Sequence, residues 1–140
     1  MILIRRATII NEGTSYVGSV LIKDDRIQEL YRTCDIPASI AAKSEIIDAT
    51  GLWLIPGVID DQVHFREPGL TQKGDIASES RSAIAGGVTS FMEMPNTNPQ
   101  TTTIDLLEQK FELASEKSFA NYSFYMGATN DNLAELKKVD

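Results

Sequence analysis

The sequence predicts an α/β protein in two parts, a small and mostly antiparallel β module over residues 1–56 and a strand–helix segment over residues 57–140. Short β-like runs separated by turn residues fill the first part, whereas strands alternate with helices after Pro56-Gly57. Such alternation is typical of parallel βαβ units with right-handed crossovers. The length of 140 residues and the 42% hydrophobic content fit a globular protein with a buried core.

Five strands are expected in the first part, at residues 3–10, 16–23, 26–31, 44–49 and 52–55. Residues that favour turns separate these runs. Asn11-Glu12-Gly13 ends the first run, and Asp24-Asp25 makes the tight turn of a β-hairpin. The stretch near Pro37 is expected to be irregular.

The second part is expected to contain three strands and three helices in alternation, at residues 58–65, 75–85, 88–94, 103–117, 122–126 and 130–139. Asp75 is the expected N-cap of the first helix because its carboxylate can accept hydrogen bonds from free backbone N–H groups. Gly86-Gly87 ends that helix, and Pro95 closes the second strand. In the second helix, apolar residues recur at the spacing of one helical face.

Charge and composition exclude several classes of function. Thirteen Lys and Arg against twenty Asp and Glu give a formal net charge of −7, which argues against binding to nucleic acid or an anionic membrane. No apolar run approaches the ~18 residues of a membrane span, and the N-terminus lacks the pattern of a secretory signal. Cys34 is the only cysteine, which excludes an internal disulfide and fits a reducing compartment. We therefore expect a cytoplasmic protein with neither a nucleic-acid nor a membrane partner.

Four polar residues fall at alternate positions of the first strand in the second part, namely Asp60, Gln62, His64 and Arg66. Because side chains alternate between the faces of a strand, these four are expected to share one face. Polar side chains on a buried strand are costly unless they are paired or bound to something. Polar residues toward the carboxyl end of a strand mark the active-site side of α/β barrels. On the opposite face, Ile59, Val63 and Phe65 are expected to lie under the crossover helices.

Each of these residues also has a simpler interpretation. A single histidine such as His64 is more often a hydrogen-bonded structural residue than a metal ligand. Asp60 can hydrogen-bond neighbouring backbone, Asp61 can lie at a solvated edge, and an isolated Arg66 is most often a surface charge. The shared phase on one strand is what favours a functional role.

A second polar segment, residues 94–99, follows the second strand with the sequence Met-Pro-Asn-Thr-Asn-Pro. Adjacent parallel strands bring their carboxyl ends together, so Asn96 is expected beside His64 and Arg66. An arginine offers a forked pair of donors for a carboxylate, and an asparagine amide can add another. The simpler interpretation is a proline-bounded loop with Asx turns.

Together these segments resemble dihydroorotase of the amidohydrolase superfamily. The family pattern has H-x-H-x-R-x-P-G at the end of the first barrel strand, followed by G-G-x-T and M-P-N-T. The corresponding segments here are Gln62-Val63-His64-Phe65-Arg66-Glu67-Pro68-Gly69, Gly86-Gly87-Val88-Thr89 and Met94-Pro95-Asn96-Thr97. The resemblance implies a small β-sandwich, to which residues 1–56 belong, and a (β/α)₈ barrel, of which residues 57–140 supply about three βα units.

The resemblance also implies roles for particular residues. His64 corresponds to the second histidine of a zinc-binding pair, and Arg66 and Asn96 correspond to the residues that hold the carboxylate of the substrate. The implied cofactor is one or two zinc ions, which lower the pKa of bound water toward ~7 and polarise the amide carbonyl. The implied reaction is reversible hydrolysis of the small molecule dihydroorotate to carbamoyl aspartate, in pyrimidine synthesis. The resemblance leaves homo-oligomer formation open.

Gln62 departs from the family pattern, because it stands where the first histidine of the pair is expected. A glutamine carbonyl oxygen is a weaker zinc ligand than an imidazole nitrogen, so the metal site is weakened, rearranged or partly lost. The remaining family ligands and the catalytic Asp belong to later strands, and His64 is the only histidine here. No catalytic residue is therefore assigned in this chain. Since a (β/α)₈ barrel takes ~250 residues, we expect an N-terminal fragment that is inactive alone.

Two other functions stay open at this point. One is a catalytically silent, dihydroorotase-like scaffold that binds a partner enzyme, an alternative motivated by Gln62. The other is a different cyclic-amide hydrolase, such as an allantoinase or a hydantoinase. Those relatives share the histidine pair and the Pro-Gly turn but lack an arginine at the position of Arg66. Arg66 together with Asn96 therefore favours dihydroorotate.

Overall fold

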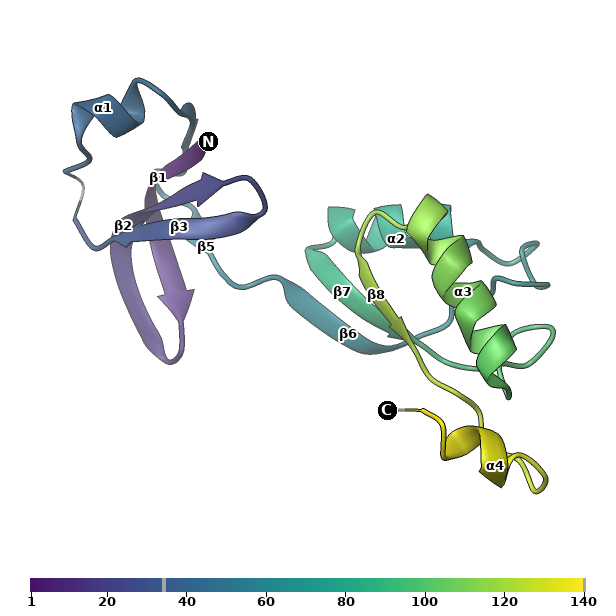
Figure 1. The fold of residues 1–140 in the computed structure, drawn as a ribbon. Helices are drawn as coiled ribbons and strands as arrows, with labels where there is room; N and C mark the ends of the chain where they lie inside the picture. The colour runs from purple at the N-terminus through teal and green to yellow at the C-terminus, as the bar shows by residue number, and fades with distance from the viewer. Residues whose placement is uncertain (34, 140) are drawn as a thin grey trace. The chain divides into compact units, whose positions relative to one another are not determined.

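The structure, a computed structural model, describes residues 1–33 and 35–139. It divides into two compact units, Met1–Pro56 and Gly57–Asp140, whose elements Figure 1 labels. The predicted α/β class is confirmed, with a β unit followed by parallel βα units. Cys34, from which we expect a reducing compartment, lies outside the described residues. Among the described residues, no helix is long and apolar enough to cross a membrane.

The first unit contains a single five-stranded sheet made of β1 (Ile2–Asn11), β2 (Thr14–Lys23), β3 (Arg26–Tyr31), β4 (Glu45–Asp48) and β5 (Trp53–Leu54). The strand order is β3-β2-β1-β4, and β5 also pairs with β1. The pairs β1–β2 and β2–β3 are antiparallel, but β4 and β5 run parallel to β1. The sheet is therefore mixed rather than mostly antiparallel, because the chain crosses over after β3 and returns alongside β1.

This sheet has a small buried cluster and, beside it, several exposed apolar side chains. A buried cluster joins strands β1 and β2 to the segment after β4, through Ala7, Ile9, Val20 and Ala49. Trp53 in β5 is 77% exposed, and Ile27 in β3 is 67% exposed. Near Pro37, where we expect irregular backbone, the chain forms the one-turn helix α1 (Ala38–Ala41).

The second unit alternates strands and helices in the order β6 (Val58–Val63), α2 (Ile76–Ala85), β7 (Val88–Glu93), α3 (Ile104–Lys117), β8 (Asn121–Phe124) and α4 (Leu133–Leu136). The three strands form a parallel sheet in the order β6-β7-β8. Helix α2 packs on β7 and helix α3 packs on β8, and the two helices contact each other. Figure 1 shows both long helices on the same side of this sheet.

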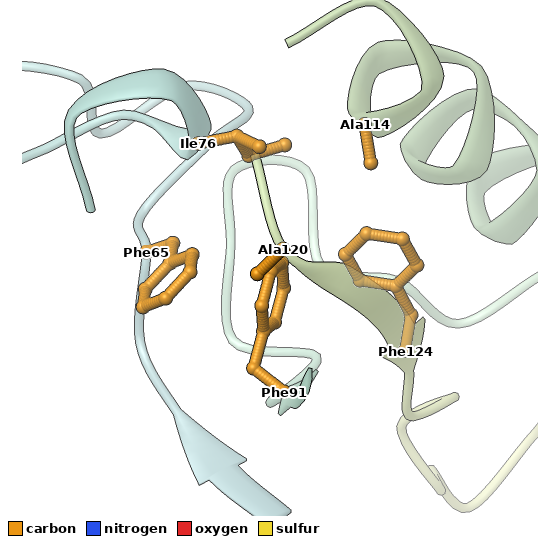
Figure 2. Packing of buried hydrophobic residues seen from close by; sticks show 6 residues of the cluster. All are labelled: Phe65, Ile76, Phe91, Ala114, Ala120 and Phe124. Atoms are coloured by element: carbon orange, nitrogen blue, oxygen red, sulfur yellow. The ribbon is translucent and has the colours of Figure 1, made fainter. Parts of the chain in front are cut away.

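The core of the second unit lies between the sheet and the two long helices. Phe91 of β7 is only 1% exposed, and its ring lies 4.4 Å from that of Phe65 and 6.4 Å from that of Phe124, between centroids. Figure 2 shows these rings with Ile76 of α2 and Ala114 of α3 around them. Burial of three aromatic rings supplies much of the hydrophobic stabilisation available to a unit of this size.

The helix signals in the sequence are confirmed for α2. The Asp75 carboxylate accepts a hydrogen bond of 2.7 Å from the backbone N–H of Ser78, and the Ser78 hydroxyl accepts one in return from the backbone N–H of Asp75. This reciprocal pair is a capping box, which satisfies two otherwise free donors. Gly86 follows the last helical residue, as expected.

The helix predicted over residues 130–139 corresponds to α4, which is shorter than predicted. Asn132 is buried, and its side-chain amide donates to the carbonyl oxygens of Thr102 and Gly127 at 2.8 and 2.7 Å. The Oδ1 atom of the Asn132 side chain accepts a hydrogen bond of 2.8 Å from the backbone N–H of Thr129. These bonds keep residues 129–132 in a turn, so α4 begins only at Leu133.

Candidate active site

The end of β6 is irregular, and this irregularity decides which side chains face the same way. In the pairing with β7, Asp60 lies opposite Phe91 and Val63 lies opposite Glu93, so three steps along β6 match two steps along β7. An extra residue of this kind is a β-bulge. The strict alternation predicted from Asp60 to Arg66 is therefore wrong, because the bulge breaks the phase between Asp60 and Val63. Asp60 instead accepts a hydrogen bond of 3.2 Å from the backbone N–H of Gln62, as in its simpler interpretation.

The phase is regular again after the bulge. Phe65 belongs to the buried core and Val63 packs against it, as predicted for the helix-facing side. The prediction for Ile59 is wrong, since this side chain is 68% exposed. Helix α2 packs on β7 and helix α3 packs on β8.

His64 and Asn96 meet across the carboxyl ends of β6 and β7. The Nδ1 atom of His64 lies 2.9 Å from the Oδ1 atom of Asn96. An amide oxygen can only accept a hydrogen bond, so Nδ1 is the donor in this contact, and in the neutral tautomer that donates from Nδ1 the Nε2 atom keeps its lone pair. A neutral imidazole with a held Nδ1–H and a free Nε2 is the form in which histidine binds metals.

Arg66 follows His64 by two residues in sequence, and its main chain is held on both sides. Its φ of +73° is in the left-handed region, which non-glycine residues rarely adopt. Its backbone N–H donates to Oε1 of Glu93 at 3.0 Å, and its carbonyl oxygen accepts from the backbone N–H of Leu70 at 3.0 Å. Of the predicted site residues, the structure brings His64 and Asn96 into direct side-chain contact, and it joins Arg66 to the same strand ends through its backbone.

Two loops dock on each other beside these residues. The backbone N–H of Asn98 donates to the carbonyl oxygen of Pro68 at 3.1 Å. A Cβ atom on Gly69, which has a φ of +81°, would lie only 1.9 Å from the carbonyl oxygen of Asn98. Glycine is therefore required at residue 69 both for its φ and for the close approach of the second loop.

An open hollow of about 410 Å³ lies at the carboxyl ends of the three strands, lined by Asp61, Gln62, Met94, Pro95, Tyr125, Met126, Gly127 and Ala128. Gln62 is the only predicted site residue among these. The segment 125–128 was not predicted to contribute. The sequence signal for this segment was its position after the third strand. That position is equivalent to the positions of His64 after the first strand and Asn96 after the second.

A buried ion pair, also not predicted from the sequence, lies directly behind these strand ends. The Nζ atom of Lys110 in α3 is 2.9 Å from Oε2 of Glu93, the last residue of β7, and each side chain is only 1% exposed. Burial raises the pKa of the Glu93 carboxyl despite the opposing effect of Lys110. Burial likewise lowers the pKa of the Lys110 ammonium group, against the effect of Glu93. Two features of the sequence could have indicated this pair. Glu93 is a charged residue on the helix-facing side of β7, and Lys110 lies within the apolar stripe of α3.

The described residues do not by themselves fit a catalytic zinc ion. Such an ion takes three protein ligands. His64 offers Nε2, and Gln62 offers a weak carboxamide oxygen. Within residues 1–33 and 35–139, no group of three or more His, Cys, Asp and Glu side chains could hold a metal ion. These residues therefore supply at most part of a metal site.

No family model matches the chain. The dihydroorotase of Lactobacillus gasseri is 36% identical over 130 residues, which are 93% of this chain and 30% of that protein. The dihydroorotase of Pelobacter propionicus is 41% identical over an alignment of 144 positions, which covers 99% of this chain and 33% of that protein. An L-hydantoinase of Paenarthrobacter aurescens is 30% identical over 140 residues, 99% of this chain and 30% of that protein.

Two hydantoinase structures superpose on this chain. The L-hydantoinase structure from Arthrobacter aurescens superposes with a TM-score of 0.87 at 30% identity, over 98% of this chain and 30% of that one. A D-hydantoinase crystal structure superposes with a TM-score of 0.79 at 29% identity, over 99% of this chain and 30% of that one. The chain spans about 30% of the length of the relatives that it matches.

Proposed function

Because the chain belongs to the dihydroorotase and hydantoinase group of the amidohydrolase superfamily, as an N-terminal portion, we propose that it binds the substrate's carboxylate in a cyclic-amide hydrolase. The proposed reaction is reversible hydrolysis of dihydroorotate to carbamoyl aspartate, a cytoplasmic step of pyrimidine synthesis. In this proposal Arg66 and Asn96 hold the carboxylate, and His64 is a zinc ligand.

The contact between His64 and Asn96 is the observation that carries this proposal. The two residues are 32 positions apart and come from separate family motifs, and their side chains lie 2.9 Å apart. With its Oδ1 engaged by the imidazole, Asn96 has its amide nitrogen free to donate to a carboxylate oxygen. The same contact fixes the imidazole ring, which leaves Nε2 available to a metal.

The chemistry of the substrate explains why an arginine belongs beside this pair. Dihydroorotate carries a carboxylate next to the cyclic amide, and a guanidinium group can bind it through two parallel hydrogen bonds. Such binding orients the ring rather than breaking the bond, and correct orientation is a large part of catalysis. Zinc, when bound to a complete ligand set, would polarise the amide carbonyl and activate water.

Hydantoin hydrolysis is the second candidate, favoured by the TM-score of 0.87 with an L-hydantoinase. The two candidates differ in what Arg66 does. A hydantoin ring bears no carboxylate, so a hydantoinase gains nothing from an arginine clamp. A silent scaffold is the third candidate, and Gln62 is its only support.

Rates of hydrolysis of dihydroorotate and of a 5-substituted hydantoin, measured on the zinc-loaded protein at its native length, separate these candidates. We expect dihydroorotate to be preferred. Arg66→Ala should lower kcat/KM for dihydroorotate by about 100-fold, since it removes hydrogen bonds to a charged group. Arg81→Ala, on the surface of α2, is the matched control and should change neither rate. A preference for the hydantoin would favour the second candidate, and no turnover of either would favour the scaffold.

A further inference from the structure

We propose that Glu93 and Lys110 form a positioning pair, in which the buried carboxylate of Glu93 holds the main chain at Arg66 in the conformation that serves the carboxylate site. This inference rests on the proposed function, in which Arg66 and Asn96 bind the substrate. Neither Glu93 nor Lys110 is proposed to contact substrate or metal.

Three segments meet at the Glu93–Lys110 pair. The Oε1 atom of Glu93 accepts the backbone N–H of Arg66 at 3.0 Å, which reaches it from the segment after β6. Its Oε2 atom lies 2.9 Å from Nζ of Lys110, which belongs to α3. The same Nζ donates to the carbonyl oxygen of Met94 at 3.3 Å. One buried pair thus ties together the residues before Asn96, the residues around Arg66 and the helix behind both.

Arg66 needs such support because of its backbone conformation. With a φ of +73°, it lies in a region that an L-residue with a side chain rarely occupies. A hydrogen bond from its N–H to an ionised acceptor is stronger than one to a neutral acceptor. Because its carbonyl oxygen is also bonded, to Leu70, both peptide groups beside the Arg66 Cα atom are fixed. The main chain therefore fixes the direction in which the Arg66 side chain leaves its Cα atom.

Stability alone does not explain a charged pair at this position. Apolar residues of similar volume are often as stabilising as a buried ion pair, or more so. Here Glu93 and Lys110 are each 1% exposed, and the Lys110 Nζ atom lies 4.8 Å from the ring centroid of Phe124, which belongs to the apolar core. The pair also stands directly below the strand ends that carry His64 and Asn96. A role in placing those strand ends accounts for both facts.

Two double variants separate the acceptor from the charges. Glu93→Gln/Lys110→Met removes both charges but keeps an oxygen that can accept the Arg66 N–H. Glu93→Leu/Lys110→Met also removes both charges but leaves no acceptor. The two readouts are amide hydrogen exchange at Arg66 and the affinity for dihydroorotate, and the amides of Phe91 and Phe124 report whether the core is folded.

In the Leu/Met protein we expect Arg66 exchange to be at least about tenfold faster and dihydroorotate affinity to be about tenfold weaker, the effect of one lost hydrogen bond to a charged group. In the Gln/Met protein both losses should be smaller, about threefold, because the amide that Glu93→Gln introduces keeps an oxygen that accepts the Arg66 N–H but accepts it more weakly than a carboxylate does. Equal losses in the two proteins, or no loss in either, would overturn the proposal.

The test stays decisive in two other cases. If the unaltered protein binds no dihydroorotate, the proposed function fails, but the difference in Arg66 exchange still decides the role of Glu93. If the Leu/Met protein does not fold, the scalar coupling across the hydrogen bond, between Arg66 N and the Glu93 carboxyl carbon of the unaltered protein, decides instead. Its presence supports the proposal and its absence overturns it.

Discussion

Gln62 is the residue that sets the proposed metal site apart from the family pattern. It lines the hollow at the strand ends, where a zinc-binding histidine is expected by family resemblance. Its carboxamide oxygen is a neutral ligand of modest affinity for zinc, whereas imidazole nitrogen is a preferred one. Residue 62 is the one position at which this segment departs from the family pattern H-x-H-x-R-x-P-G.

Gln62→His should therefore raise the affinity for zinc by about tenfold or more, because it adds a strong ligand near His64. Competition with a chelating dye measures this affinity. Gln28→His, in β3 of the other unit, is the matched control and should not change it. Equal affinities of the unaltered and Gln62→His proteins would show that residue 62 does not face the metal.

At the level of secondary-structure elements, the capped helix α2 could be predicted in detail, and the strand end that carries the site could not. Asp75, Ser78 and Gly86 act on neighbours within a few residues, so local sequence determines them. The bulge between Asp60 and Val63 depends on pairing with β7, and the pair of Glu93 with Lys110 depends on how α3 packs. Such tertiary contacts leave only weak signals in sequence.

The Asp75 cap gives a pH-dependent prediction. The hydrogen bond from the Ser78 backbone N–H lowers the pKa of the Asp75 carboxyl in the folded protein. A lowered folded-state pKa contributes stability above the unfolded pKa of about 3.9, and that contribution is lost as the pH falls through the folded value. The Tm of Asp75→Asn should therefore lie below that of the unaltered protein at pH 7, and the two should converge in acid.

Thermal unfolding between pH 2 and pH 7 measures this difference. Asp105→Asn is the control, since it removes an acidic residue from the first turn of α3 but leaves the Thr103 cap in place. A Tm difference between Asp75→Asn and the unaltered protein that does not change with pH would contradict the account.

The contact between the two site loops gives a prediction about Gly69. Gly69→Ala should destabilise the unit by clearly more than Gly87→Ala, because both residues have a positive φ but only residue 69 meets a neighbouring carbonyl. A positive φ alone costs an alanine about 1–2 kcal/mol. Urea unfolding measures both variants, and equal losses would show that the loops can separate at no cost.

Taken whole, the molecule carries part of a site rather than a complete one. Its sequence contains a single histidine, and its described residues offer no group of three metal ligands. The fold class and the family were predictable because several motifs occur in order along the chain. The meeting of His64 with Asn96 was also expected, since adjacent parallel strands end together. The hollow formed with residues 125–128 was not, because nothing in that segment resembles a binding motif.

The 140-residue chain should therefore show no hydrolysis of dihydroorotate by itself, even with added zinc. An absorbance assay of ring opening measures this, with a dihydroorotase of known activity as the positive control. Turnover that survives purification and disappears in His64→Ala would contradict this expectation, and it would mean that two ligands suffice.

The central claim is that Arg66 and Asn96 together bind a carboxylate. Titration of the isotopically labelled protein with carbamoyl aspartate, followed through side-chain N–H signals, tests it most directly. We predict saturable shifts of the Arg66 Nε–H and the Asn96 amide, while Arg81 and Asn121, which lie away from the strand ends, stay unchanged. Arg66→Ala should abolish the shift at Asn96. Shifts of equal size at all four residues, or none at Arg66 and Asn96, would contradict the account.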